Sequence, residues 1–116
     1  MKLLIAGSRS ITDFDLTPHV PADADLIITG GAKGVDTLAE AYARERGIPT
    51  VTVKPCYERY GRAAPIRRDE EMVDMADEVL VIWDGVSRRS RHTADYARKR
   101  GKPLTVVTVG PKSDSA

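Results

Sequence analysis

Short apolar runs recur along the chain at intervals that suit alternating strands and helices. The runs are nearly continuous rather than alternating in polarity, which is typical of parallel strands buried on both faces. Five strands are therefore predicted, at Leu3–Ala6, Leu26–Thr29, Thr50–Val53, Val79–Trp83 and Leu104–Val109.

Helical patterns lie between most of these strands. From Val35 onward, apolar residues recur with the spacing of one helix face, and Gly47 followed by Pro49 predicts the end of that helix. Two further helices are predicted, at about Pro65–Ala76 and about Arg91–Arg100. Residues 11–24 contain two prolines and predict at most a short helix.

This alternation predicts an α/β fold, a Rossmann-like three-layer sandwich with helices on both faces of the sheet. We expect about five parallel strands in the order 3-2-1-4-5, forming one domain over residues 1–110 with a flexible tail at residues 111–116. Ligands of such sheets bind beyond the carboxyl ends of the strands, where the strand order reverses. Here that point lies between the first and fourth strands.

Three loops expected at this edge combine glycine, a hydroxyl and a cation. Backbone N–H groups at a helix start, together with a nearby cation, form a site for anions such as phosphate. The candidate ligand-binding residues in and beside these loops are Gly7, Ser8, Arg9, Gly30, Gly31, Ala32, Lys33, Gly34, Asp36, Asp84, Gly85, Ser87, Arg89, Ser90 and Arg91. Arg68 and Asp69, at the start of the predicted helix 65–76, are added as candidates.

The glycine loop at residues 30–34 does not match the common nucleotide motifs. It lacks the spacing of a Walker A loop, and it approximates G-x-G-x-x-G only with Thr29 in place of the first glycine. A dinucleotide site also calls for an acidic residue after the next strand, where this chain has Lys54. An ordinary dinucleotide-dependent dehydrogenase is therefore not expected.

Composition narrows the classes of partner. The 116 residues carry a net charge of only +1, whereas nucleic-acid-binding domains usually carry a larger positive excess. No apolar run has membrane-spanning length, and no His or Cys spacing indicates a metal site. A single cysteine, Cys56, excludes a disulfide within the chain and suits a cytoplasmic location. No cofactor is expected to be required.

Several motifs together resemble those of the SLOG superfamily, in particular its small single-domain YspA-like branch. They are Gly7-Ser8-Arg9, Gly30-Gly31-Ala32-x-Gly34-Val35-Asp36, Trp83-Asp84-Gly85-x-Ser87 and the segment YGRAAPIRRDEEMV at residues 60–73. The superfamily includes the LOG phosphoribohydrolases, the DNA-processing protein DprA and sensor domains for nucleotide-derived signals. The resemblance implies a Rossmann-like fold and a nucleotide-type ligand over these loops.

The chain departs from the LOG enzymes after the fourth strand. Those enzymes carry P-G-G-x-G-T-x-x-E, whereas this chain has Arg89-Ser90 in place of Gly-Thr and Thr93 in place of the catalytic glutamate. The favoured hypothesis is therefore a binding or sensor module for a nucleotide or an ADP-ribose-like ligand. The alternatives are a nucleoside 5′-monophosphate phosphoribohydrolase, with Asp36 or Asp84 as a substitute carboxylate, and DprA-like binding of single-stranded DNA.

Other residues are open to two interpretations. The acidic positions 69–71 and 74 look like a solvated helix face, although Arg68 and Asp69 are also placed to face the pocket. Tyr57 and Tyr60 are candidates for stacking on a base or for packing within a loop or subunit interface. A homodimer or higher homo-oligomer is expected by analogy with relatives.

Overall fold

The computed structural model describes residues 1–110, which form a five-stranded, entirely parallel sheet. The strands are β1 (Lys2–Gly7), β2 (Leu26–Thr29), β3 (Thr50–Thr52), β4 (Glu78–Trp83) and β5 (Leu104–Thr108). Their spatial order is β3-β2-β1-β4-β5. In the central strand, Leu4 lies opposite both Ile28 of β2 and Val79 of β4. The predicted strand order is confirmed.

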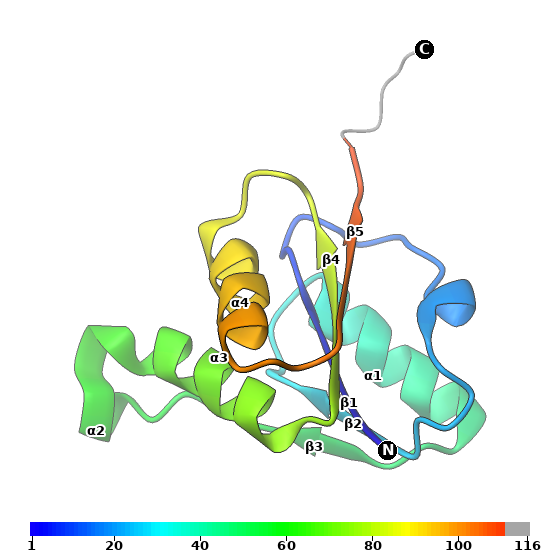
Figure 1. Cartoon of the computed structure of the whole chain (residues 1–116), viewed down its shortest axis with the longest axis horizontal. Helices are drawn as coiled ribbons and strands as arrows, with labels where there is room; N and C mark the ends of the chain where they lie inside the picture. The colour runs from blue at the N-terminus through cyan, green and yellow to red at the C-terminus, as the bar shows by residue number, and fades with distance from the viewer. Residues whose placement is uncertain (111–116) are drawn as a thin grey trace.

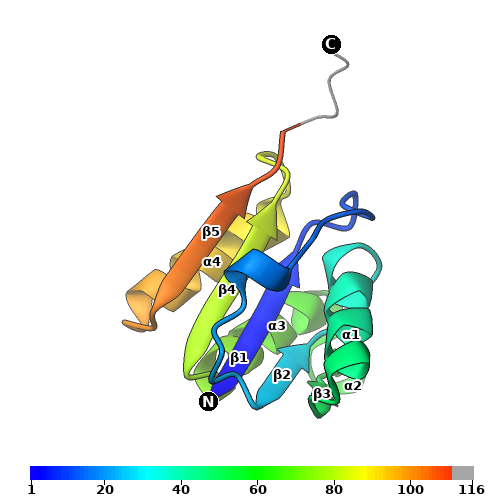
Figure 2. The same cartoon turned by 90° about the vertical axis from the view of Figure 1, so that its right-hand side faces the viewer.

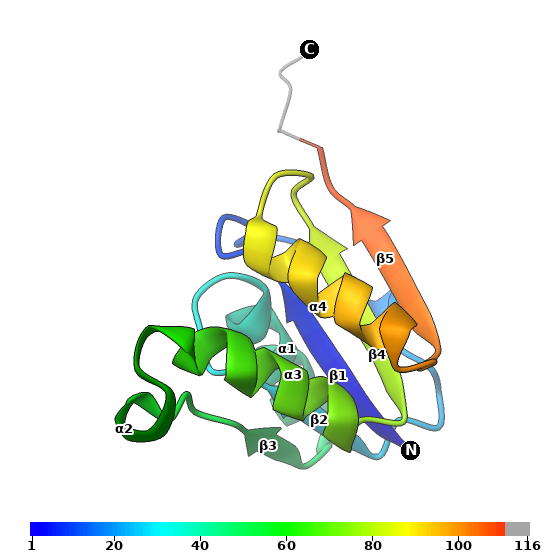
Figure 3. The ribbon, with the colours of Figure 1, turned by 60° about the vertical axis from the view of Figure 1, so that its left-hand side comes forward.

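Helices cover both faces of this sheet, which confirms the three-layer sandwich (Figure 1, Figure 2). The helical segments are η1 (Thr17–His19), α1 (Val35–Arg46), α2 (Tyr57–Tyr60), η2 (Gly61–Ala63), α3 (Ala64–Met75) and α4 (Arg88–Lys99). Helices α3 and α4 lie side by side on one face, and α1 with the η1 segment covers the other (Figure 2, Figure 3).

Side chains on the two faces of each central strand belong to two separate apolar clusters. On β1, Leu3 and Ile5 pack with Ala39 and other residues of the α1 layer, while Leu4 packs toward the α3–α4 layer. These β1 side chains are fully buried, as is Val81 of β4. Burial on both faces explains why the strands are continuous apolar runs rather than alternating ones.

The helix ends agree with the sequence prediction in α1 and differ in α4. Helix α1 ends at Arg46, and Gly47 caps it. The left-handed conformation of Gly47 (φ 67°) lets its N–H bind the carbonyls of Ala43 and Arg44. Helix α4 begins at Arg88, three residues before the predicted start, because the Ser87 side chain accepts a hydrogen bond from the Ser90 N–H and caps the helix.

Two features of the chain lie outside the predictions or the described residues. The short helices α2 and η2 were not predicted, and they protrude from the sheet between β3 and α3 (Figure 3). The predicted tail at 111–116 lies outside the described residues. None of the helices in residues 1–110 is long and apolar enough to span a bilayer.

Candidate functional site

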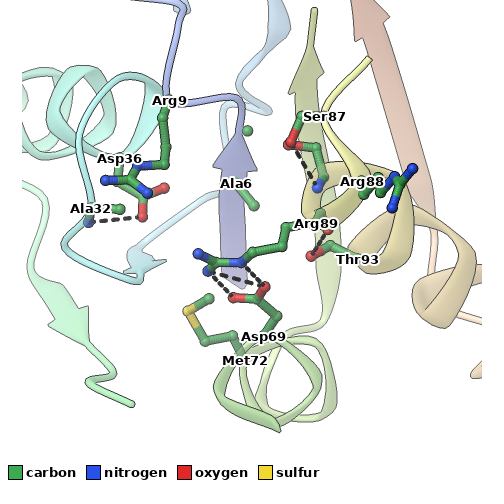
Figure 4. A pocket seen from close by; sticks show the side chains of 12 residues that line it. Ala6, Arg9, Ala32, Asp36, Asp69, Met72, Ser87, Arg88, Arg89 and Thr93 are labelled. Atoms are coloured by element: carbon green, nitrogen blue, oxygen red, sulfur yellow. Dashed lines mark hydrogen bonds and ion pairs between the residues drawn. The ribbon is translucent and has the colours of Figure 1, made fainter. Parts of the chain in front are cut away.

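A pocket of about 220 Å³ opens beyond the carboxyl ends of β1 and β4, at the point where the strand order reverses (Figure 4). Segments from β1, the starts of α1 and α4, and helix α3 surround it. Its lining consists of Ala6, Gly7, Arg9, Ala32, Asp36, Asp69, Met72, Ser87, Arg88, Arg89, Ser90 and Thr93. The pocket therefore occupies the position that the parallel topology predicts for a ligand.

Ser8 joins the loops that follow β1 and β4 from beneath the pocket. Its side chain is buried, with Oγ accepting a 3.0 Å hydrogen bond from the Asp84 N–H and lying 3.4 Å from Ser90 Oγ. Its carbonyl accepts from the N–H groups of Ile11 and Val35, both at 3.3 Å. With these partners, Ser8 fixes the positions of neighbouring loops and does not itself line the pocket.

Asp84 organises the turn that leads from β4 into α4. Its Oδ1 accepts hydrogen bonds from the N–H groups of Val86 (2.9 Å) and Ser87 (2.8 Å), and its Oδ2 accepts one from Ser10 Oγ (2.8 Å). The two backbone bonds are the main cause that lowers the pKa of this carboxyl to about 2. Asp84 is thus a structural anion outside the pocket lining.

The glycines after β2 allow close approach between loops. A Cβ at Gly34, where φ is +77°, would overlap the carbonyl oxygen of Ser8 and would lie 2.6 Å from that of Arg9. A Cβ at Gly30 would lie 2.7 Å from Nη1 of Arg68. A side chain at Gly34 would therefore push against the loop after β1, and one at Gly30 would push against Arg68 of α3.

Arg68 is a buried cation that links three parts of the site. Its Nη1 donates to the carbonyl oxygens of Gly30 (2.7 Å) and Val53 (3.2 Å), and its Nε donates to Asp69 Oδ1 (2.8 Å). Arg68 and Asp69 are only 4% and 5% exposed. A buried ion pair is tolerated when its remaining hydrogen-bonding groups are satisfied, and these contacts provide that satisfaction.

Asp36 brings a second buried carboxylate to the pocket, from the first turn of α1. Its Oδ2 accepts a 3.1 Å hydrogen bond from the Ala32 N–H. Burial raises the pKa of the Asp36 carboxyl above its usual range, although the Ala32 bond and the charge of Arg68 act in the opposite direction. Asp36 is therefore easier to protonate than an exposed aspartate.

Arginines and helix starts make the pocket favourable for an anion. Arg9, Arg88 and Arg89 line it, against the carboxylates of Asp36 and Asp69. The starts of α1 and α4 both border the pocket, although the N–H groups of Val35 and Ser90 are already bonded to the Ser8 carbonyl and to Ser87 Oγ. The positive end of each helix dipole adds to this preference for negative charge.

The comparison with known families agrees with this geometry. The model of the YspA, cpYpsA-related SLOG family matches residues 1–60. The chain belongs to this family. Neither the curated proteins nor the solved structures gave a significant match to this SLOG protein.

The family match covers one side of the pocket and not the other. Residues 1–60 of this SLOG protein supply Ala6, Gly7, Arg9, Ala32 and Asp36. The other seven lining residues, from α3 and from the start of α4, lie beyond the matched segment. The α3–α4 side of the pocket therefore lies outside the segment that the family model matches.

The structure brings eight of the predicted site residues together around the pocket. These are Gly7, Arg9, Ala32, Asp36, Asp69, Ser87, Arg89 and Ser90. The predicted residues that do not line it are Ser8, Gly30, Gly31, Lys33, Gly34, Arg68, Asp84, Gly85 and Arg91. Several of this second group, including Ser8, Gly34 and Arg68, hold the lining residues in place.

Three lining residues were not predicted for the site: Ala6, Met72 and Thr93, whereas Arg88 lies within the segment Ser87–Arg91 that was expected to contact a phosphate. Ala6 is near the end of β1, and Met72 follows Asp69 by about one helical turn, so both positions were accessible from the predicted elements. Thr93 follows Arg89 by one turn of α4, and its Oγ1 donates to the Arg89 carbonyl at 3.1 Å.

Other candidates lie away from the pocket. Tyr57 is 61% exposed, and neither it nor Tyr60 lines the pocket. His92 forms a 2.9 Å contact with Glu70 on the α3–α4 surface. Within residues 1–110, no group of three or more His, Cys, Asp or Glu side chains is arranged to hold a metal ion.

Proposed function

We propose that the pocket binds a nucleotide or nucleotide-derived ligand through its phosphate, and that the protein acts as a binding or sensor module. Membership of the SLOG family suggests a nucleotide-related ligand. The observation that carries the proposal is that Arg9, Arg88 and Arg89 all line a pocket beside the starts of α1 and α4, at the switch point of the sheet. Such an arrangement binds phosphate by charge and by backbone N–H groups.

The size of the pocket favours a particular part of such a ligand. Its volume of about 220 Å³ is smaller than the roughly 300–1,000 Å³ of pockets that enclose a drug-sized ligand. A phosphate with its neighbouring sugar is a better match than an entire nucleotide. In this proposal the base or second half of the ligand extends outside the pocket.

Calorimetry with matched ligands tests the proposal. We expect AMP, ADP-ribose and ribose 5-phosphate to bind, and adenosine, which lacks the phosphate, to bind at least about tenfold more weakly. Replacing a pocket arginine, in Arg88→Gln, is expected to weaken AMP binding by a similar factor. Arg98→Gln is the control, because Arg98 lies at the far end of α4 in an ion pair with Asp95.

The outcome that contradicts the proposal is equally specific. Equal affinities for AMP and adenosine would exclude recognition through the phosphate. Equal losses in Arg88→Gln and Arg98→Gln would mean that general surface charge, rather than this pocket, attracts the ligand.

A second candidate function, hydrolysis of a nucleoside 5′-monophosphate, is favoured by one observation. Asp36 lines the pocket, and its pKa is raised by burial, as expected of a group that exchanges protons during catalysis. Asp84, the other candidate carboxylate, is engaged by the Val86 and Ser87 amides outside the lining. Hydrolysis would break the bond between C1′ and the base, with the water's hydroxyl going to C1′ and its proton to the base.

Incubation with AMP distinguishes the two functions. A sensor leaves AMP intact, whereas a hydrolase releases adenine and ribose 5-phosphate in equal amounts. Release that disappears in Asp36→Asn would establish the enzymatic function. Binding of AMP without release above a heat-inactivated control would exclude it.

A further inference from the structure

Asp69 sits between two arginines that hold it unequally. Arg68, which is buried, donates from Nε at 2.8 Å. Arg89, which reaches across the pocket from the start of α4, makes three longer contacts of 3.3, 3.3 and 3.4 Å, and 39% of its side chain is exposed (Figure 4). Charge-assisted hydrogen bonds are strongest at about 2.7–2.9 Å, so only the Arg68 contact lies in that range.

The two arginines also differ in how firmly they are fixed. Arg68 is held in place by the carbonyl oxygens of Gly30 and Val53 as well as by Asp69. The contacts that the structure gives to the Arg89 guanidinium are all with Asp69. Arg89 can therefore move while Arg68 stays.

Departure of Arg89 would not leave an isolated buried charge. Removing the sole partner of a buried carboxylate is costly because the remaining charge is uncompensated. Asp69 would keep its short contact with Arg68, so that cost is largely avoided. The Arg89–Asp69 contact is consequently an exchangeable ion pair.

We propose that Arg89 determines the specificity of the pocket for phosphorylated ligands by exchanging Asp69 for the ligand's phosphate. This inference rests on the proposed function. Arg89 is the second residue of α4, so a phosphate at the helix start lies within reach of its guanidinium and close to first-turn N–H groups. In the structure Arg89, Asp69 and Met72 all line the same side of the pocket (Figure 4).

A fixed Arg89 would have the opposite effect on binding. If Arg89 remained on Asp69, it would act only as a wall that reduces the space for the ligand. Removing its guanidinium would then leave affinity unchanged or increase it. Exchange predicts a loss of affinity, because the arginine contributes charge-assisted bonds to the bound phosphate.

The test compares Arg89→Gln with Arg91→Gln by calorimetry against AMP and adenosine. Both changes remove one positive charge from the first turn of α4, but Arg91 is outside the pocket lining, with a side chain that is 72% exposed. We expect Arg89→Gln to weaken AMP binding at least about tenfold and to leave adenosine binding unchanged. Arg91→Gln is expected to change AMP affinity less than about twofold, as for a screened surface charge.

NMR of the wild-type protein supplies a second readout that does not depend on a variant's folding. The Arg89 Nε–H resonance is expected to shift on addition of AMP and not of adenosine, while the Arg68 resonance stays in place. AMP binding by the wild type with undiminished affinity in Arg89→Gln, or with a stationary Arg89 resonance, would overturn the exchange and leave the proposed function standing. Failure of the wild type to bind AMP, ADP-ribose or ribose 5-phosphate would overturn both.

Discussion

Replacing Gly34 with alanine is expected to destabilise the protein more than any ordinary glycine-to-alanine change. Gly34 precedes α1 with φ 77° and ψ −126°, a conformation that costs other residues about 1–3 kcal/mol. The new Cβ would also overlap the Ser8 carbonyl oxygen and lie 2.6 Å from the Arg9 carbonyl oxygen. Overpacking of this kind costs about 1–3 kcal/mol, so the free energy of unfolding should fall by about 2–6 kcal/mol.

Gly47→Ala is the matched control for this change. Gly47 also has a positive φ, at 67°, but apart from its own chain neighbours no heavy atom of residues 1–110 lies within 4 Å of the position its Cβ would take. Its replacement should therefore cost only the left-handed backbone conformation, about 1–2 kcal/mol. The difference between the two variants reports the contact between the glycine loop and the loop after β1, together with the less accessible backbone conformation of Gly34 (ψ −126°, against 27° at Gly47).

Urea denaturation at neutral pH measures both free energies of unfolding. The reasoning is wrong if the two variants lose the same stability, because the close approach of Gly34 to Ser8 and Arg9 would then carry no cost. AMP affinity gives a second check, since displacement of Arg9 in Gly34→Ala should weaken binding while Gly47→Ala leaves it unchanged.

Three further predictions concern the charged groups around the pocket. Arg68→Met should lower the free energy of unfolding by about 1–3 kcal/mol, because the carbonyls of Gly30 and Val53 lose their donor and Asp69 keeps only its longer contacts with Arg89. Arg67→Met at an exposed position should change it by less than about 1 kcal/mol in the same denaturation assay. Asp84→Ala should cost about 1 kcal/mol at neutral pH, after allowance for solvent screening. Since the wild-type pKa is lowered from 3.8 to about 2, that difference should shrink as the pH falls through this interval, and a constant difference in acid denaturation curves would contradict the assigned bonds. Asp36→Asn should become more stable relative to wild type as the pH rises above 3.8. Burial raises the pKa of the Asp36 carboxyl, so ionising it lowers the free energy of unfolding of the wild type but not of the variant. Urea curves that give the same difference in free energy of unfolding at pH 3 and pH 7 would refute this.

The sheet could be predicted because its physical cause is local in the sequence. Strands buried on both faces must be apolar throughout, and Gly47 with Pro49 ends α1 whatever the tertiary context. The short helices at Tyr57–Tyr60 and Gly61–Ala63 left no comparable pattern, because a segment of three or four residues is too short to show helical periodicity.

Parts of the site could not be predicted because they depend on distant residues. The sequence leaves Asp69 open to two interpretations, a solvated helix face or the pocket, and its burial depends on ion pairs with Arg68 and with Arg89, which is twenty positions away. The position at which α4 begins also decides which arginines face the pocket. With the helix beginning at Arg88, residues 89 and 93 face the pocket and Arg91 points to solvent.

The central position of β1 has a consequence for how the protein is made. The Lys2 N–H bonds the carboxylate of Asp77, 75 residues later in the chain, and Ser8 contacts Ser90, 82 residues after it. At roughly 5–20 residues per second, a ribosome needs about 4–15 s to supply β4 after β1 has been synthesised. During that interval the edge of β1 that later pairs with β4 is exposed to other chains. Assistance from a chaperone should therefore matter most before residue 83 has emerged, and the two halves of the pocket can meet only afterwards.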